Sequence, residues 1–240
     1  MQLHIQKDST AVSHELAEWI TSNIEKTLAS KDRFTWVVTG GNSPKLLYEL
    51  LAKAPYRDRI DWSKLHIFWG DERAVPFDDS RNNARMTYEQ LLSHVPVVKE
   101  QVHIMKTDIS PEASAADYEK VLHGYFGDSG ETFDLVLNGM GDDGHTLSLF
   151  PGTEVIHETK AWVKSFWLPA QDMFRITLTA PVVNRAHQVA FLTFGANKAH
   201  ALQEVLKNAG NVDQYPSQII QPASGELHWF VDEAAAAGIQ

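Results

Sequence analysis

The chain has 240 residues, of which 43% are hydrophobic and 22% are charged, and it contains no cysteine. The lack of thiols excludes disulfides, thiolate catalysis and cysteine zinc sites, and the formal net charge of −10 argues against a general nucleic-acid binder. No apolar run is long enough to cross a membrane and the first residues lack a signal-peptide pattern, so we expect a cytoplasmic protein. No internal repeat, low-complexity tract or flexible linker appears, which favours a single domain over residues 1–240.

Apolar patterns predict strands and helices that follow one another along the whole chain. The expected strands lie at residues 3–5, 34–39, 65–69, 102–104, 133–138, 162–166, 174–179, 189–194 and 225–232. The expected helices lie at residues 12–28, 44–51, 81–92 and 111–126, in a short segment from 181, and from 199 to 206. Strands that alternate with helices indicate a parallel sheet with helical crossovers.

A glycine-rich turn, Gly40-Gly41-Asn42-Ser43-Pro44, follows the second expected strand. Ser43 followed by Pro44 is the pattern of a helix N-cap and first helical position. The glycines in front would leave backbone N–H groups free, and helix N-termini of this kind bind phosphate. The turn matches neither a dinucleotide fingerprint nor a P-loop, which argues against a nucleotide ligand. A plain capped turn is the alternative.

Charged residues follow the third expected strand, at Gly70-Asp71-Glu72-Arg73. Charges directly behind a buried strand are costly unless they face a cleft or solvent. Arg73 is suited to bind a phosphate or carboxylate, and Asp71 to act as a base or to hold a hydroxyl or a histidine. A surface ion pair is the alternative.

Arg175 interrupts the apolar alternation of the expected strand at residues 174–179, so it either emerges at a sheet end or faces a polar cleft.

The turn at residues 139–152 is the strongest candidate for chemistry. An apolar strand breaks into a turn with three glycines, Asp142, Asp143 and His145, and a short apolar segment then resumes, which predicts a strand-to-helix turn. Histidine is readily used as a general base near neutral pH, and the two aspartates are candidates to support it. The alternative is an ordinary polar turn in which His145 caps the next element.

Four expected strands end in glycine and then in polar residues, at 40–43, 70–73, 139–145 and 195–198. In a parallel sheet these turns meet at one edge. The resulting crevice would hold a base, carboxylates, two cations and a helix N-terminus, which fits a small phosphorylated, hydroxyl-rich ligand. The candidate catalytic residues are Asp71, Asp143 and His145, and the candidate substrate-binding residues are Gly40, Gly41, Asn42, Ser43, Arg73, Arg175 and Lys198.

Five motifs resemble, in the same order, the 6-phosphogluconolactonase family, which is grouped with the glucosamine-6-phosphate deaminases. They are Gly-Gly-Asn-Ser-Pro from residue 40, Trp-Gly-Asp-Glu-Arg-Ala-Val from 69, Gly-Met-Gly-Asp-Asp-Gly-His-Thr-Leu-Ser-Leu-Phe-Pro-Gly from 139, Arg-Ile-Thr-Leu-Thr-Ala-Pro from 175 and Gly-Ala-Asn-Lys-Ala from 195. The resemblance implies a doubly wound, modified Rossmann-like α/β fold with a mostly parallel sheet flanked by helices. It also implies hydrolysis of 6-phosphoglucono-δ-lactone to 6-phosphogluconate without metal or cofactor. His145 would be the base with Asp143 beside it, and the turn at 41–43, Arg73 and Lys198 would bind phosphate.

The chain departs from the family at Asn82, where serine is more common, and at Leu147, where alanine is usual. A related deaminase has a glutamate just before the proline that follows the histidine, whereas this chain has Phe150 there. Because opening an amino sugar ring needs that extra acid–base group, the difference favours the lactonase. A metal hydrolase is a second enzyme alternative, but Asp142, Asp143 and His145 lack the i, i+4 spacing of metal ligands on a helix. A sugar-phosphate sensor without turnover is the non-enzyme alternative. We expect a phosphorylated sugar lactone as partner, no nucleic acid or membrane, and a monomer or small homo-oligomer.

Overall fold

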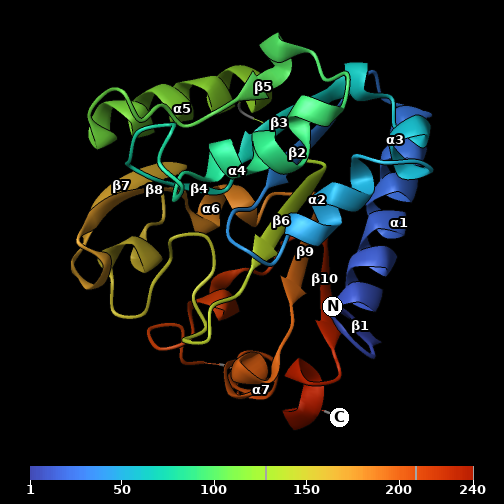
Figure 1. Cartoon of the computed structure of the whole chain (residues 1–240). Helices are drawn as coiled ribbons and strands as arrows, with labels where there is room; N and C mark the ends of the chain where they lie inside the picture. The colour runs from blue at the N-terminus through green and yellow to red at the C-terminus, as the bar shows by residue number, and fades with distance from the viewer. Residues whose placement is uncertain (128, 209, 240) are drawn as a thin grey trace.

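The computed structural model describes residues 1–127, 129–208 and 210–239, and its centre is a seven-stranded sheet in which all neighbouring strands are parallel (Figure 1). The strand order is β1-β10-β9-β6-β2-β3-β5. The strands are β1 (Gln2–Gln6), β2 (Phe34–Val38), β3 (Leu65–Trp69), β5 (Val102–His103), β6 (Leu135–Gly139), β9 (Gln188–Thr193) and β10 (Glu226–Asp232). The predicted α/β class with a mostly parallel sheet is confirmed.

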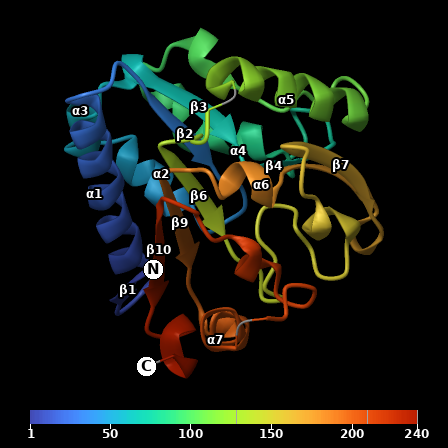
Figure 2. The ribbon, with the colours of Figure 1, turned by 180° about the vertical axis from the view of Figure 1, so that it is seen from behind.

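Helices cover both faces of this sheet, as the two opposite views show (Figures 1 and 2). One face carries α1 (Ser9–Leu28), α2 (Lys45–Leu51), α3 (Tyr56–Arg59) and α4 (Asn83–Gln90). The other face carries α5 (Pro111–Phe126), α6 (Ala180–Val183) and α7 (Ala199–Lys207). The sheet is therefore the shared wall of two hydrophobic cores.

The alternation of side chains explains why the central strands are apolar throughout. In β2, Trp36 and Val38 enter the core under α1, whereas Val37 between them enters the core under α5. In β6, Leu135 enters the first core and Val136 the second. A strand covered on both faces has no solvent side, so it reads as a continuous apolar run and not as an alternation.

A second, smaller sheet packs beside the helices of the second face and was not anticipated from the sequence. Its strands are β4 (Asp71–Arg73), β8 (Met173–Leu178) and β7 (Val163–Leu168), all antiparallel in the order β4-β8-β7. The sequence predicts residues 71–73 to be a polar turn, but they pair with β8 and place Arg73 opposite Arg175. The chain therefore passes from β3 of the large sheet directly into β4 of the small sheet.

Two local expectations at the sheet edge are wrong. No helix follows directly after β6. Residues 146–149 instead form a short turn closed by a bridge between Thr146 and Leu149, and Leu147 within it has φ +54. The apolar residues that suggested a helix, Leu147 and Leu149, are buried in the second core from this loop. Ser43 is not a helix N-cap: a turn bond from the Lys45 N–H to the Asn42 carbonyl precedes α2, which starts at Lys45 without a side-chain cap.

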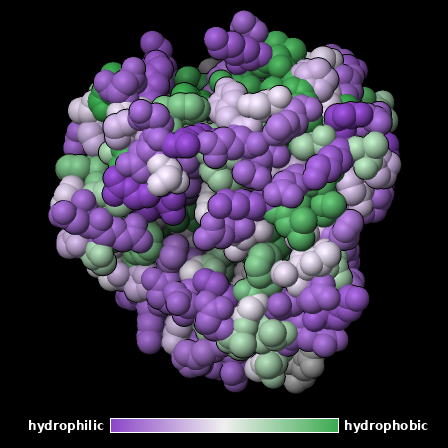
Figure 3. All heavy atoms as spheres, in the orientation of Figure 1, coloured by the Kyte–Doolittle hydropathy of each residue, from purple (hydrophilic) through white to green (hydrophobic). Residues whose placement is uncertain are grey.

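The outer surface is mostly polar. The face in Figure 3 is largely hydrophilic, with apolar side chains in small patches. Among the described residues, no helix combines the length and the apolar character needed to span a membrane.

Candidate active site

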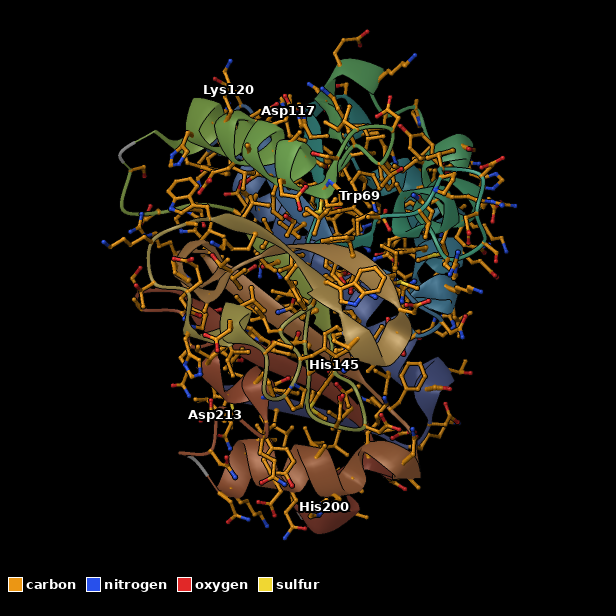
Figure 4. The ribbon with its side chains drawn as sticks, turned by 90° about the vertical axis from the view of Figure 1, so that its left-hand side faces the viewer. Trp69, Asp117, Lys120, His145, His200 and Asp213 are labelled. Atoms are coloured by element: carbon orange, nitrogen blue, oxygen red, sulfur yellow. The ribbon has the colours of Figure 1, made fainter. Side chains whose placement is uncertain are left out.

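The structure brings the four glycine-containing turns together at one cleft of about 180 Å³. The loops after β2, β6 and β9 supply one part of its lining, and β4 and β8 of the small sheet supply another. His145 and Asp71 line the cleft, as do all seven candidate binding residues: Gly40, Gly41, Asn42, Ser43, Arg73, Arg175 and Lys198. Figure 4 shows His145 between the ribbon of the small sheet and helix α7.

Two cations that line the cleft, Arg73 and Lys198, are placed there by neighbouring backbone and lie outside any salt bridge among the described residues. Arg73 donates from Nη1 to the carbonyl of Arg81 at 2.8 Å, and Lys198 ends a short 3-10 turn that leads into α7. In the part of the chain that the structure describes, neither side chain takes part in a salt bridge. The glycine turn also contributes to the lining, with Gly41 in the left-handed region at φ +86, where a side chain would be strained. This arrangement suits an anionic group of a ligand.

His145 is held by the aspartate two residues before it. Its Nδ1 lies 2.6 Å from Asp143 Oδ1, and the same oxygen accepts the backbone N–H of His145 at 3.1 Å. Burial raises the pKa of Asp143, but its hydrogen bonds to His145 outweigh burial and the net pKa lies below the ordinary value. With Nδ1 bound to a carboxylate, Nε2 is the ring nitrogen that remains for a ligand or a water. Sequence left open which aspartate contacts the histidine; the structure places Asp143 there.

Asp71 instead belongs to a buried network in the wall of the cleft. Its carboxylate accepts hydrogen bonds from Arg175 Nη2 at 2.5 Å and from Ser148 Oγ at 2.6 Å. Arg175 also donates from Nε to Ser148 Oγ at 2.9 Å. Burial raises the pKa of Asp71, but the guanidinium groups of Arg175 and Arg73 more than compensate, so its pKa is lowered. The network ties the His145 loop to the small sheet.

Glu72 points the other way and anchors helix α4. It is 1% exposed, and its carboxylate accepts the backbone N–H groups of Arg73, Asn83 and Ala84 at 2.7–2.9 Å. Burial raises the pKa of Glu72 to about 7 although these three donors oppose the shift. The bonds fix the start of α4 against β4 and so hold Asn83 at the cleft.

Sequence reasoning missed several residues of this site. Asn83 lines the cleft and donates from Nδ2 to the backbone carbonyl of Asp71 at 2.9 Å, whereas Asn82 caps α4 and lies outside the cleft lining. The paired asparagines were a signal for a polar helix start, but not for which of them faces the ligand. Ser148 gave no signal because it stands among apolar residues.

Gly141 leaves the space that the His145–Asp143 pair occupies. A Cβ at this position would lie 2.1 Å from His145 Nδ1 and 2.4 Å from Asp143 Oδ1, so one of them must move. We expect Gly141→Ala to lower kcat by about tenfold or more, because it would displace the pair that is the candidate base of this cleft. Steady-state kinetics and circular dichroism would measure the effect. Gly124→Ala is the control, since a Cβ there meets nothing within 4 Å; equal kinetics for both variants would contradict the prediction.

Known proteins similar to this chain match it over nearly its whole length. A family model described as glucosamine-6-phosphate isomerases/6-phosphogluconolactonase matches residues 7–229. A protein of Synechocystis named 6-phosphogluconolactonase is 40% identical over 225 residues, which is 92% of this chain and 91% of that protein. The crystal structure of 6-phosphogluconolactonase from Thermotoga maritima is 29% identical with a TM-score of 0.82, covering 96% of this chain and 99% of that one.

A solved monomeric glucosamine-6-phosphate deaminase has the same fold, with a TM-score of 0.85 at 17% identity and coverage of 99% of this chain and 100% of that one. Because one fold is found with both names, the side chains of the cleft, and not the fold, must distinguish the two activities.

Proposed function

Because the chain belongs to the glucosamine-6-phosphate isomerase/6-phosphogluconolactonase family, we propose that it hydrolyses 6-phospho-D-glucono-1,5-lactone to 6-phosphogluconate, a reaction of the oxidative pentose phosphate pathway. The observation that carries this proposal is the His145–Asp143 pair at 2.6 Å in a cleft that also presents Arg73 and Lys198. A base and an anion-binding region in one cleft match the two ends of a phosphorylated lactone.

In the proposed reaction, His145 Nε2 removes a proton from water as the water oxygen bonds to the lactone carbonyl carbon, C1. The tetrahedral oxyanion is met by backbone N–H groups of the glycine turns or by a cationic side chain of the cleft. The bond between C1 and the ring oxygen then breaks, and protonated His145 returns the proton to that oxygen. Asp143 holds the imidazole at Nδ1 and stabilises its charged form.

The phosphate would bind far from C1, where Arg73, Lys198 and the turn at 41–43 supply donors. Binding at this end orients the ring over the base and lowers the entropic part of the barrier. Arg73 is further restrained by its bond to the Arg81 carbonyl, so less side-chain freedom is lost when a ligand binds.

Lys198→Ala should raise KM for the lactone by about 10- to 100-fold with a much smaller change in kcat, because a charge-assisted hydrogen bond contributes about 1.5–3 kcal/mol. Initial rates over a range of lactone concentrations would measure both constants. Lys207→Ala, at the exposed C-terminal end of α7, the helix that follows Lys198, is the control and should leave both unchanged. A fall in kcat at unchanged KM would assign Lys198 to the chemical step instead.

The test of the proposed function is lactone hydrolysis measured beside glucosamine-6-phosphate deamination, both with a chelator present. We expect hydrolysis above the spontaneous rate and no deamination, because Phe150 has no acid–base group where the deaminase has glutamate. Among the described residues no group of three or more His, Asp or Glu side chains could hold a metal ion. Loss of activity with chelator would support a metal hydrolase, and binding of 6-phosphogluconate without hydrolysis would support a sensor.

A further inference from the structure

Phe150 is a buried aromatic residue that packs against polar residues of the site. It is 8% exposed, yet it belongs to neither of the two hydrophobic cores. Its ring stacks on the imidazole of His145, with ring centroids 4.1 Å apart and an angle of 27° between the planes. The guanidinium carbon of Arg175 lies 5.6 Å from its ring centroid. These contacts indicate a role beyond filling apolar volume.

The stacking supplies a restraint that the hydrogen bond to Asp143 lacks. That bond fixes His145 at Nδ1, but the ring can still rotate about the contact. A flat neighbour 4.1 Å away fixes the plane of the imidazole. With both restraints, Nε2 keeps one position relative to the cleft, which His145 lines and Phe150 does not. Phe150 therefore acts from behind the imidazole, on the base and not on the ligand.

The phenyl group matters chemically because it places no carboxylate beside the imidazole and the guanidinium. Among the described residues Asp143 is the one carboxylate bonded to the His145 ring, and Arg175 is already bonded to Asp71 and Ser148. A carboxylate at position 150 would offer a second acceptor to the imidazole and a second anion to the guanidinium. A phenyl ring does neither, while it still attracts the guanidinium through its π face.

We propose that Phe150 is a positioning residue whose ring holds His145 in the single orientation that directs Nε2 toward the attacking water. The role of that water rests on the proposed function, but the restraint on the imidazole is a property of the free protein. The ring also keeps Asp143 as the one acidic partner of His145.

The kinetic test compares Phe150→Leu, which keeps apolar volume but removes the flat face, with Phe150→Tyr, which keeps the ring. Phe150→Leu should lower kcat at least tenfold, with KM and the Kd of 6-phosphogluconate within about twofold of wild type, and Phe150→Tyr should restore kcat to within about threefold. Phe166→Leu is the matched control, because it removes a partly buried ring that packs on the second core. Wild-type kcat in folded Phe150→Leu, or a Tyr variant as slow as the Leu variant, would overturn the proposal.

A second readout needs no activity. The ¹⁵N NMR signals of the His145 ring should report one tautomer in the wild type and in Phe166→Leu, and a mixture of tautomers or added exchange broadening in Phe150→Leu. Unchanged signals in Phe150→Leu would overturn the positioning role whatever the kinetics. If the wild type lacks lactonase activity but the signals change as expected, the proposed function fails and the positioning of His145 by Phe150 stands.

Discussion

Replacing His145 with alanine should lower kcat for lactone hydrolysis by about 10²- to 10⁴-fold, the usual contribution of one general base. The affinity for 6-phosphogluconate should change by less than about threefold, because the side chains proposed to bind phosphate remain in place. The reason is geometric: Nδ1 is bound to Asp143 at 2.6 Å, so Nε2 is the one ring atom left to accept the proton of water. Rates measured with freshly generated lactone, corrected for spontaneous hydrolysis, and product binding by calorimetry would test it.

Two further variants make this result specific. His145→Gln retains a polar side chain of similar length but has no titratable ring, so it should be almost as slow as the alanine variant. His94→Ala removes an exposed histidine far along the chain from the site and should retain wild-type kcat. If His145→Ala and His94→Ala hydrolysed the lactone equally fast, His145 would not be the base.

Replacing Arg175 with methionine should lower the free energy of unfolding by about 3–5 kcal/mol, because it leaves a buried carboxylate without its cation. Arg175 is 2% exposed and Asp71 is 6% exposed, so the carboxylate is largely shielded from water when it loses its ion-pair partner. Methionine fills much of the same volume, which limits the effect of packing. Denaturant unfolding would measure the loss. Arg57→Met breaks an exposed pair with Asp58 and should cost less than about 1 kcal/mol.

The pH dependence of that loss identifies its electrostatic origin. The pKa of Asp71 is below its ordinary value in the folded protein, so the pair stabilises the fold above the unfolded-state pKa, and this contribution disappears as the pH falls through the lower folded-state pKa. In Arg175→Met the carboxyl can protonate more readily, so the stability difference from wild type should shrink in acid. The double variant Asp71→Asn with Arg175→Met should recover part of the loss. A difference that grew in acid would contradict the assignment.

Continuous apolar runs predicted the central strands, and helical periodicity predicted most of the longer helices, close to their observed bounds. The small sheet was missed for a physical reason: β4 is three charged residues long, and its partner β8 is about a hundred residues away in sequence. Its pairing is decided by tertiary contacts that leave no local period. The expected helix after β6 failed similarly, because Leu147 and Leu149 are buried from a loop with a left-handed residue.

The site was predictable where the chemistry is local and unpredictable where it depends on distant segments. His145 and Asp143 are two residues apart, so their contact could be suspected from the turn itself. The pairing of Asp71 with Arg175 joins residues 104 positions apart and needs the register of the small sheet. The sequence distinguished Phe150 as the residue at the position of a deaminase glutamate, but it could not show that the ring stacks on the imidazole of His145.

The cleft lies between the edge of the large sheet and the small sheet, and both contribute to its lining. A sugar phosphate held there would crosslink two layers that otherwise meet through packing and the Asp71–Arg175 network. Ligand concentrations about a hundredfold above Kd would add about 2.7 kcal/mol to the stability of the native state. The lifetime of this protein under heat or proteases would therefore depend on the metabolite pool around it, so substrate depletion would limit the amount of catalyst as well as its rate.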